Sequence, residues 1–226
     1  MDPDARRGRR RGETRSADPL TVVRRRRLFA FALGVALYAA APGAQPQTGG
    51  IVFVGSSIFH RWTALSLQMA PLPITNLAFD GSVTSDMLRM VDSRVIPLRP
   101  KVIAYYCGSN DVDSGEPAAA IVGRILQFVN RVATALPDTR VIFVSVNRAP
   151  EKQDLWDVVD EVNRQIQRYA AMHPGVEFVD VNPVLFNPDG TSRLDLFMDD
   201  ELHLRPRAYE LFTKILKPVL TRALHP

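Results

Sequence analysis

From residue 50 onward, short runs of β-branched and aromatic residues alternate with longer amphipathic segments. Short apolar runs between turn residues predict buried strands, and the amphipathic segments predict helices. The predicted strands span residues 51–55, 74–79, 101–106, 140–146 and 176–180. The predicted helices span residues 59–70, 84–95, 117–135, 154–171 and 206–223. Such alternation of strands and helices predicts an α/β fold, a parallel sheet that helices cover on both faces.

The proline residues fit this division of the chain. Proline cannot donate a backbone hydrogen bond, so it is poorly tolerated inside a helix or a central strand. The connections between the predicted elements contain Pro71, Pro73, Pro97, Pro100, Pro137 and Pro174. The chain has 226 residues, 46% of them hydrophobic, which is enough material for one ordinary core. We therefore predict a single domain over residues 46–226.

Residues 1–44 have the layout of an export signal. A charged segment ends in Arg24–Arg27, an apolar run extends from Leu28 to Ala41, and small residues continue to Ala44. This order of charged, apolar and small residues is typical of a cleaved secretory signal. The apolar run is shorter than the roughly 20 residues that a membrane-spanning helix needs. We expect an exported protein, periplasmic or secreted, with an uncleaved N-terminal anchor as the alternative.

The basic character of the chain belongs to that leader. Residues 1–44 contain ten of the 28 Lys and Arg residues and four of the 24 Asp and Glu residues, which leaves 18 basic and 20 acidic residues for the remainder. A slightly acidic domain gives no indication of nucleic-acid binding. We therefore expect no nucleic-acid partner, and membrane contact only through the N-terminal signal or anchor.

Small polar and charged residues gather where the predicted strands end. In strand order, these groups are Ser56–Ser57, Asp80–Ser82, Gly108–Asp111, Asn147–Arg148 and, in the long connection after the fifth strand, Asp200–His203. The carboxyl ends of parallel strands meet at one edge of the sheet, where adjoining helices also direct their N-termini. We therefore expect these five segments to form one site.

Serine, histidine and aspartate within this set are the parts of a nucleophilic site. A serine hydroxyl needs an imidazole to accept its proton and a carboxylate to orient that imidazole. Asp200 precedes His203 by three residues, so both side chains can lie on the same side of one turn. The residues alone do not separate Ser56 from Ser57, because both lie near the free amides that begin the predicted helix.

Donors for a developing oxyanion are available at the same edge. A serine in the first turn of a helix can donate its own backbone N–H. Gly81 has no side chain, so its N–H can approach an oxygen closely, and Asn110 offers a side-chain amide. Asn147 and Arg148 are placed to line the acyl or alcohol side of the pocket.

Four of these segments resemble the sequence blocks of the GDSL, or SGNH, hydrolase family in order and spacing. The blocks are Gly55–Ile58, Asn76–Gly81, Gly108–Asp111 and Asp200–His203, and the resemblance extends over residues 50–223. It implies a flavodoxin-like three-layer α/β/α sandwich with a five-stranded parallel sheet. It also implies acyl-ester substrates and no metal or other cofactor.

The resemblance also implies a role for each residue of the site. The implied set is Ser57 as nucleophile and oxyanion donor, Gly81 and Asn110 as further donors, His203 as general base and Asp200 as its orienting partner. The family usually has Asp where this chain has Ser56, and we expect the change to be tolerated because a short side-chain oxygen suffices for helix capping. Phe59 excludes the Gly-x-Ser-x-Gly elbow of the α/β-hydrolases.

Other chemically notable residues have no partner set in the sequence. Cys107 is the only cysteine, so it cannot close an intrachain disulfide. The acidic residues around His203 lack the accompanying His or Cys ligands of a transition-metal site. We expect packing or solvent-exposed roles for His60, His173, Trp62, Trp156, Asp195, Asp199 and Glu201.

These features together predict a serine esterase or acylhydrolase that cleaves carboxylic esters through an acyl-enzyme. The compact domain has no obvious apolar lid insertion, which favours small acyl groups such as the O-acetyl groups of carbohydrates. The alternatives are a lysophospholipase or thioesterase with the same site, and a non-catalytic envelope binding module on the same fold.

Overall fold

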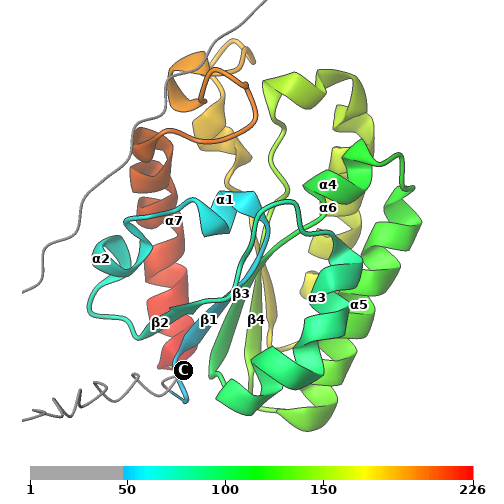
Figure 1. Ribbon diagram of the computed structural model, residues 1–226, viewed down its shortest axis with the longest axis vertical. Helices are drawn as coiled ribbons and strands as arrows, with labels where there is room; N and C mark the ends of the chain where they lie inside the picture. Colours follow the sequence, from blue (N-terminus) through cyan, green and yellow to red (C-terminus); the bar gives the residue numbers. More distant parts are fainter. Residues whose placement is uncertain (1–47, 226) are drawn as a thin grey trace, which may run out of the picture. The chain divides into compact units, whose positions relative to one another are not determined.

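The computed structural model describes residues 48–225, so the predicted leader over residues 1–44 lies outside the described residues. Its centre is a five-stranded parallel sheet in the order β2-β1-β3-β4-β5 (Figure 1). The strands are β1 (Ile51–Gly55), β2 (Ile74–Asn76), β3 (Val102–Tyr106), β4 (Arg140–Val144) and β5 (Val176–Val179). This is the flavodoxin-like strand order, and the predicted fold class is confirmed.

Helices cover both faces of the sheet. They are α1 (Ser57–His60), α2 (Leu65–Met69), α3 (Thr84–Met90), α4 (Ser109–Asp113), α5 (Ala118–Ala135), α6 (Trp156–Met172) and α7 (Pro206–Leu224). Figure 1 shows α7, with α1 and α2, on one face and α3, α5 and α6 on the other. Within residues 48–225, no helix is both long and apolar enough to cross a membrane.

Burial on both faces explains the continuous apolar runs of the strands. Every residue of β1 is buried, and its side chains alternate between two cores. Ile51 and Phe53 belong to the core beneath α7, whereas Val52 and Val54 belong to the core beneath α3, α5 and α6. Strands sandwiched in this way are expected to be apolar at every position rather than at every second one.

Three of the predicted helices, 117–135, 154–171 and 206–223, are confirmed to within two residues. The predicted helix 59–70 is wrong, because α1 and α2 are separate short helices. Trp62 lies between them, only 2% exposed, and its indole N–H donates to Oε1 of Gln68 at 2.6 Å. The chain therefore turns at this point to bury the indole, which a continuous helix would not allow.

Two other predicted elements end early. The predicted strand 74–79 stops at Asn76, whose side-chain amide donates to the carbonyl of Phe59 at 2.8 Å while its oxygen accepts the N–H of Ala78 at 3.0 Å. The predicted helix 84–95 is α-helical only to Met90 and continues as a π-helical turn, Val91–Val95. Helix α4 was not predicted, because five residues carry no detectable periodicity.

An aromatic cluster supports the turn that follows β1. The ring of Phe59 in α1 packs against Phe53 of β1 at 4.8 Å between centroids. Trp62 stacks on Tyr209 of α7 at 5.0 Å. Aromatic pairs of this kind contribute roughly 0.5–1.5 kcal/mol each beyond the area that they bury. They fix α1 against the sheet and against α7.

Gly55 ends β1 where β3 passes very close. A Cβ atom at this position would lie 1.9 Å from the carbonyl oxygen of Tyr106, well inside the van der Waals limit. Gly123 in α5 is a natural contrast, because a Cβ atom there would meet nothing within 4 Å.

We predict that Gly55→Ala lowers the free energy of unfolding by about 3 kcal/mol, as expected when an atom is forced into a packed core. Gly123→Ala should raise it by about 0.5–1 kcal/mol, because alanine is the better helix former. Urea denaturation of both variants measures the difference. Equal stability of the two variants would show that β1 and β3 can separate without cost.

Candidate active site

The side chains of Ser57, His203 and Asp200 form a hydrogen-bonded chain. Oγ of Ser57 lies 3.0 Å from Nε2 of His203, and Nδ1 of His203 lies 2.6 Å from Oδ2 of Asp200. An ionised carboxylate can only accept a hydrogen bond, so Nδ1 carries a proton and Nε2 is free to accept the serine hydroxyl proton. This arrangement allows an imidazole to activate a serine.

The main chain at the end of β1 fixes the position of Ser57. Ser57 is the first residue of α1 and is 8% exposed. The N–H of Ser56 donates to the carbonyl of Tyr106 at 3.1 Å, and its carbonyl accepts the N–H of His60 at 3.0 Å. The expected side-chain cap from Ser56 is wrong, since its hydroxyl makes no capping hydrogen bond. Main-chain bonds hold this turn instead, and only the Ser57 hydroxyl contacts His203.

The Asp200 carboxylate is stabilised in its charged form. Desolvation raises its pKa, but the hydrogen bond from the His203 side chain, together with backbone N–H groups of His203 at 2.9 Å and Leu202 at 3.1 Å, outweighs that effect. The net result is a pKa of about 2 for Asp200. The carboxylate therefore remains charged at neutral pH, as an orienting partner of His203 must.

The Gly81 turn and Asn110 are tied to the same place. Oγ of Ser82 donates to the carbonyl of Gly55 at 3.0 Å, and Nδ2 of Asn110 donates to the carbonyl of Ser82 at 2.9 Å. Gly81 has φ +71°, a left-handed conformation that glycine adopts without strain. The side-chain amide nitrogen of Asn110 carries two hydrogens, so one remains for another acceptor after the bond to Ser82.

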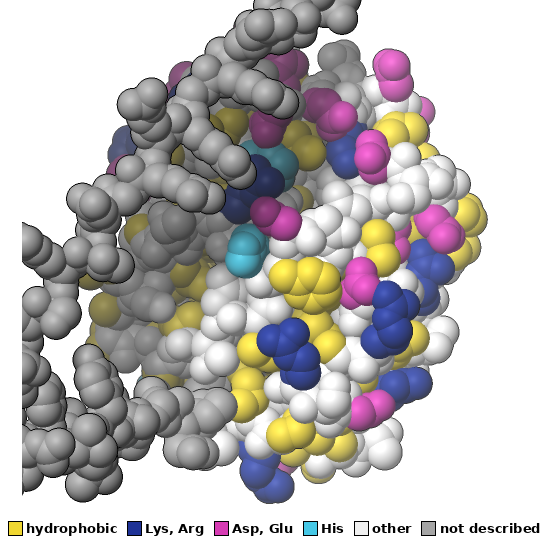
Figure 2. All heavy atoms as spheres, viewed as in Figure 1, with side chains coloured by type: hydrophobic (Ala, Val, Ile, Leu, Met, Phe, Trp, Pro, Cys, Tyr) yellow, Lys and Arg dark blue, Asp and Glu magenta, His cyan; other side chains and the backbone are white. Residues whose placement is uncertain are grey.

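A bidentate ion pair links the helix of Ser57 to the Gly81 turn, and sequence reasoning missed it. Nε of Arg61 lies 3.1 Å from Oδ1 of Asp80, and Nη2 lies 3.2 Å from Oδ2. The hydrogen bonds from Arg61 lower the pKa of Asp80. Figure 2 shows His, basic and acidic side chains side by side on the face that carries α1. The pair spans 19 residues without any pattern that could have identified it.

A buried carboxylate holds α4, the helix that carries Asn110. Asp111 is 2% exposed and accepts the backbone N–H of Thr84 at 3.0 Å and Nη2 of Arg124 at 3.1 Å. The carboxylate therefore joins α4 to α3 and α5. Its full set of partners explains its burial, because a buried charge is tolerated only when it is paired.

Lys152, which sequence reasoning also missed, connects two parts of the site. It is 5% exposed, and its Nζ donates to the carbonyl of Ser109 at 3.3 Å and lies 3.3 Å from Oδ1 of Asp113. The preceding residue, Glu151, donates its N–H to the carbonyl of Glu201 at 3.3 Å. This segment therefore joins the Asn110 helix to the loop of Asp200 and His203.

Asn147 and Arg148 differ in their surroundings. Asn147 is 3% exposed, and within residues 48–225 neither polar atom of its side chain has a hydrogen-bond partner. The side chain of Arg148 pairs with Asp160 of α6 and lines a separate cavity beside β5.

The other notable residues have structural contacts. Nδ1 of His60 lies 3.0 Å from the carbonyl oxygen of Ala78, and His173 stacks on Tyr169 at 3.7 Å between ring centroids. The indole N–H of Trp156 donates to the carbonyl of Ala149 at 2.8 Å. Asp195 and Asp199 pair with arginines. Over the described part of the chain, no three His, Cys, Asp or Glu side chains are grouped as a metal site requires.

The chain is similar to known proteins in its sequence pattern and in its fold. The model of the GDSL-like Lipase/Acylhydrolase family matches residues 39–211. No curated protein is significantly similar to the chain in sequence.

Three solved structures illustrate the similarity in fold. A GDSL-like lipase from Bacteroides thetaiotaomicron is 19% identical with a TM-score of 0.67, over 76% of this chain and 88% of that one. A carbohydrate esterase of family 3 from Talaromyces cellulolyticus is 17% identical with a TM-score of 0.62, over 78% and 98%. An acetyl-xylooligosaccharide esterase variant from Geobacillus Stearmophilus is 16% identical with a TM-score of 0.60, over 80% and 96%.

The lowered pKa of Asp200 predicts a pH-dependent contribution to stability. A carboxylate whose pKa falls on folding stabilises the folded state above its unfolded pKa, close to 3.8, and this contribution is lost as the pH falls through about 2. Asp200→Asn should therefore be less stable than the wild type at pH 7, by a small amount because the side chain is 47% exposed. Urea unfolding at several pH values should show the difference shrinking from pH 4 to pH 2. A difference that is constant over this range would contradict the assigned ionisation.

Proposed function

The chain belongs to the GDSL-like lipase/acylhydrolase family and is a serine ester hydrolase, and we propose that it removes small acyl groups from carbohydrates through an acyl-enzyme on Ser57. The observation that carries the proposal is the hydrogen-bonded chain from the Ser57 hydroxyl through His203 to Asp200. Ser57 and His203 are 146 positions apart in the sequence, so the fold and not local structure brings them together.

In the first half of the reaction, Oγ of Ser57 attacks the carbonyl carbon of the ester while its proton passes to Nε2 of His203. The tetrahedral oxyanion accepts hydrogen bonds from the N–H groups of Ser57 and Gly81 and from the amide of Asn110. Each such donor contributes about 3–4 kcal/mol in comparable sites. His203 then gives the proton to the alcohol oxygen, the ester C–O bond breaks, and the acyl group remains on Ser57.

In the second half, water replaces the alcohol. His203 accepts a proton from the water as it attacks the acyl carbon, and the same oxyanion donors stabilise the second tetrahedral intermediate. Collapse of this intermediate releases the carboxylic acid and returns the proton to Oγ of Ser57. Asp200 stays ionised throughout and stabilises the imidazolium form of His203 in both halves.

The names of two similar structures support a small acyl group on a glycan. One is named as a family 3 carbohydrate esterase and one as an acetyl-xylooligosaccharide esterase. These names support acetyl groups on a carbohydrate as the substrate of this chain.

We predict that Ser57→Ala lowers kcat on p-nitrophenyl acetate by about 10⁴-fold or more, because the variant lacks the nucleophile. Ser56→Ala is the matched control. Its hydroxyl does not contact His203, so its activity should stay within about tenfold of the wild type. Circular dichroism establishes that both variants are folded. Near-native activity of Ser57→Ala together with loss of activity in Ser56→Ala would transfer the nucleophile's role to Ser56.

The acyl preference is tested with a series of p-nitrophenyl esters of increasing chain length. A site for acetyl groups predicts that kcat/KM is highest for acetate and falls by at least about tenfold at octanoate, since a longer chain leaves methylene groups in water. A maximum at long chains would instead support a lysophospholipase. Acyl-coenzyme A substrates, assayed in parallel, distinguish a thioesterase.

We also propose that residues 1–44 direct export of a domain that begins near residue 46. Support comes from the charged, apolar and small residues in that order. Fusion of residues 1–44 to alkaline phosphatase in a bacterial host should give phosphatase activity and a shortened product in the periplasmic fraction. A full-length, membrane-bound fusion would establish an anchor, and an inactive cytoplasmic fusion would rule out export.

A further inference from the structure

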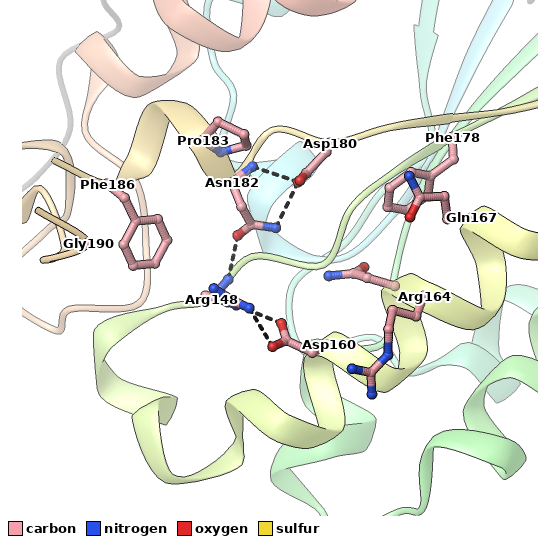
Figure 3. A pocket seen from close by; sticks show the side chains of 11 residues that line it. Arg148, Asp160, Arg164, Gln167, Phe178, Asp180, Asn182, Pro183, Phe186 and Gly190 are labelled. Atoms are coloured by element: carbon pink, nitrogen blue, oxygen red, sulfur yellow. Dashed lines mark hydrogen bonds and ion pairs between the residues drawn. The ribbon is translucent and has the colours of Figure 1, made fainter. Parts of the chain in front are cut away.

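A polar cavity of about 450 Å³ opens beside β5, at the same edge of the sheet as the active site. One wall is formed by α6, and the other by the residues that follow β5. Figure 3 shows Arg148, Asp160 and Arg164 along its lower side and Asp180 and Asn182 above them. The volume lies within the range of small-molecule sites, roughly 300–1,000 Å³.

Part of the lining is held rigid by its own hydrogen bonds. Nε of Arg148 donates to Oδ1 of Asp160 at 2.6 Å, and its backbone N–H donates to Oδ1 of Asn182 at 2.8 Å. Nδ2 of Asn182 donates to Oδ1 of Asp180 at 3.1 Å, and the same oxygen accepts the hydroxyl of Ser145 at 2.8 Å. The residues after β4, those after β5 and helix α6 are thereby fixed around the cavity before any ligand arrives.

Other polar groups of the lining remain available to a ligand. Within residues 48–225, Oδ2 of Asp180 and the side-chain amide of Gln167 make no hydrogen bond, and Arg164 uses Nε and Nη2 but not Nη1. The ring of Phe186 lies at one end, packed edge-on against Trp156 at 5.5 Å between centroids. The cavity thus offers acceptors, donors and an apolar ring.

This combination fits a neutral polyhydroxylated ring. Two arginines and two aspartates balance each other, so an anion would face two carboxylates as well as two guanidinium groups. An acyl chain would leave the polar lining without partners, which costs free energy. Hydroxyl groups can both donate and accept, and the C–H face of a sugar can pack on an aromatic ring.

The position of the cavity relates it to the active site. Ser57 follows β1, and Arg148 and Asp180 follow β4 and β5. Three strand steps separate β1 from β5, which is about 14 Å at the usual spacing between strands. A short oligosaccharide with its acyl group at Ser57 can span this distance.

We propose that this cavity is a sugar-binding subsite, which holds an unmodified residue of the glycan whose acyl group is cleaved at Ser57. The proposal rests on the proposed function and names the substrate as an oligosaccharide or longer glycan rather than a free acylated monosaccharide.

The test measures sugar binding in the Ser57→Ala protein by calorimetry, with xylotetraose, cellotetraose and chitotetraose as probes. Arg164→Ala combined with Gln167→Ala removes two side chains from the exposed surface of α6. Binding of at least one probe is expected, and the combined variant should weaken it about tenfold. Arg168→Ala is the matched control, since it also pairs with Glu161 on α6 but does not line the cavity.

Failure of the subsite can be told apart from failure of the proposed function. The combined variant with Ser57 intact should hydrolyse p-nitrophenyl acetate at the wild-type rate, because the cavity is remote from Ser57. Absence of binding for all three probes, or equal binding by the combined variant and the control, would overturn the subsite. Absence of p-nitrophenyl acetate hydrolysis by the wild type would overturn the proposed function, whatever the binding result.

Discussion

The close approach of β1 to β3 at Gly55 is the constraint on which the site depends. The Gly55 Cα lies so near the Tyr106 carbonyl that no side chain fits, and the Gly55 carbonyl accepts the N–H of Phe79 at 3.1 Å and the hydroxyl of Ser82 at 3.0 Å. One residue thus fixes the start of α1, which carries Ser57, and the turn that carries Gly81. A catalytic arrangement is effective only when its supports are this rigid.

The remaining supports are charges and rings from distant parts of the chain. The ion pair of Arg61 with Asp80 joins α1 to the Gly81 turn, and Lys152 joins the Asn110 helix to the segment that contacts the His203 loop. Trp62 and its aromatic neighbours hold α1 against α7. The ion pair of Arg61 with Asp80 is half exposed, so it adds little to the free energy of folding and serves mainly to position the two segments. Lys152 is buried, and leaving its charge without a partner would cost folding free energy.

The fold was largely predictable because its signals are local. Five apolar runs, the prolines between them and the polar residues at strand ends indicate both the parallel sheet and the edge where Ser57 and His203 meet. The break at Trp62, the pair of Arg61 with Asp80, and the role of Lys152 could not be predicted. Each depends on a contact between residues that only the folded chain brings together. The cavity beside β5 is of the same kind, since its walls come from α6, from β5 and from the residues that follow β4 and β5.

The central claim is that His203 activates Ser57 in the folded protein. The most direct measurement is the reaction of the wild-type protein with a fluorophosphonate, followed by mass spectrometry of the peptides. The account predicts one adduct, on Ser57, formed at a rate that falls at least about 100-fold in His203→Ala, because the imidazole no longer removes the serine proton. An unlabelled wild-type protein, an adduct on Ser56, or labelling that is unaffected by the His203 substitution would contradict it.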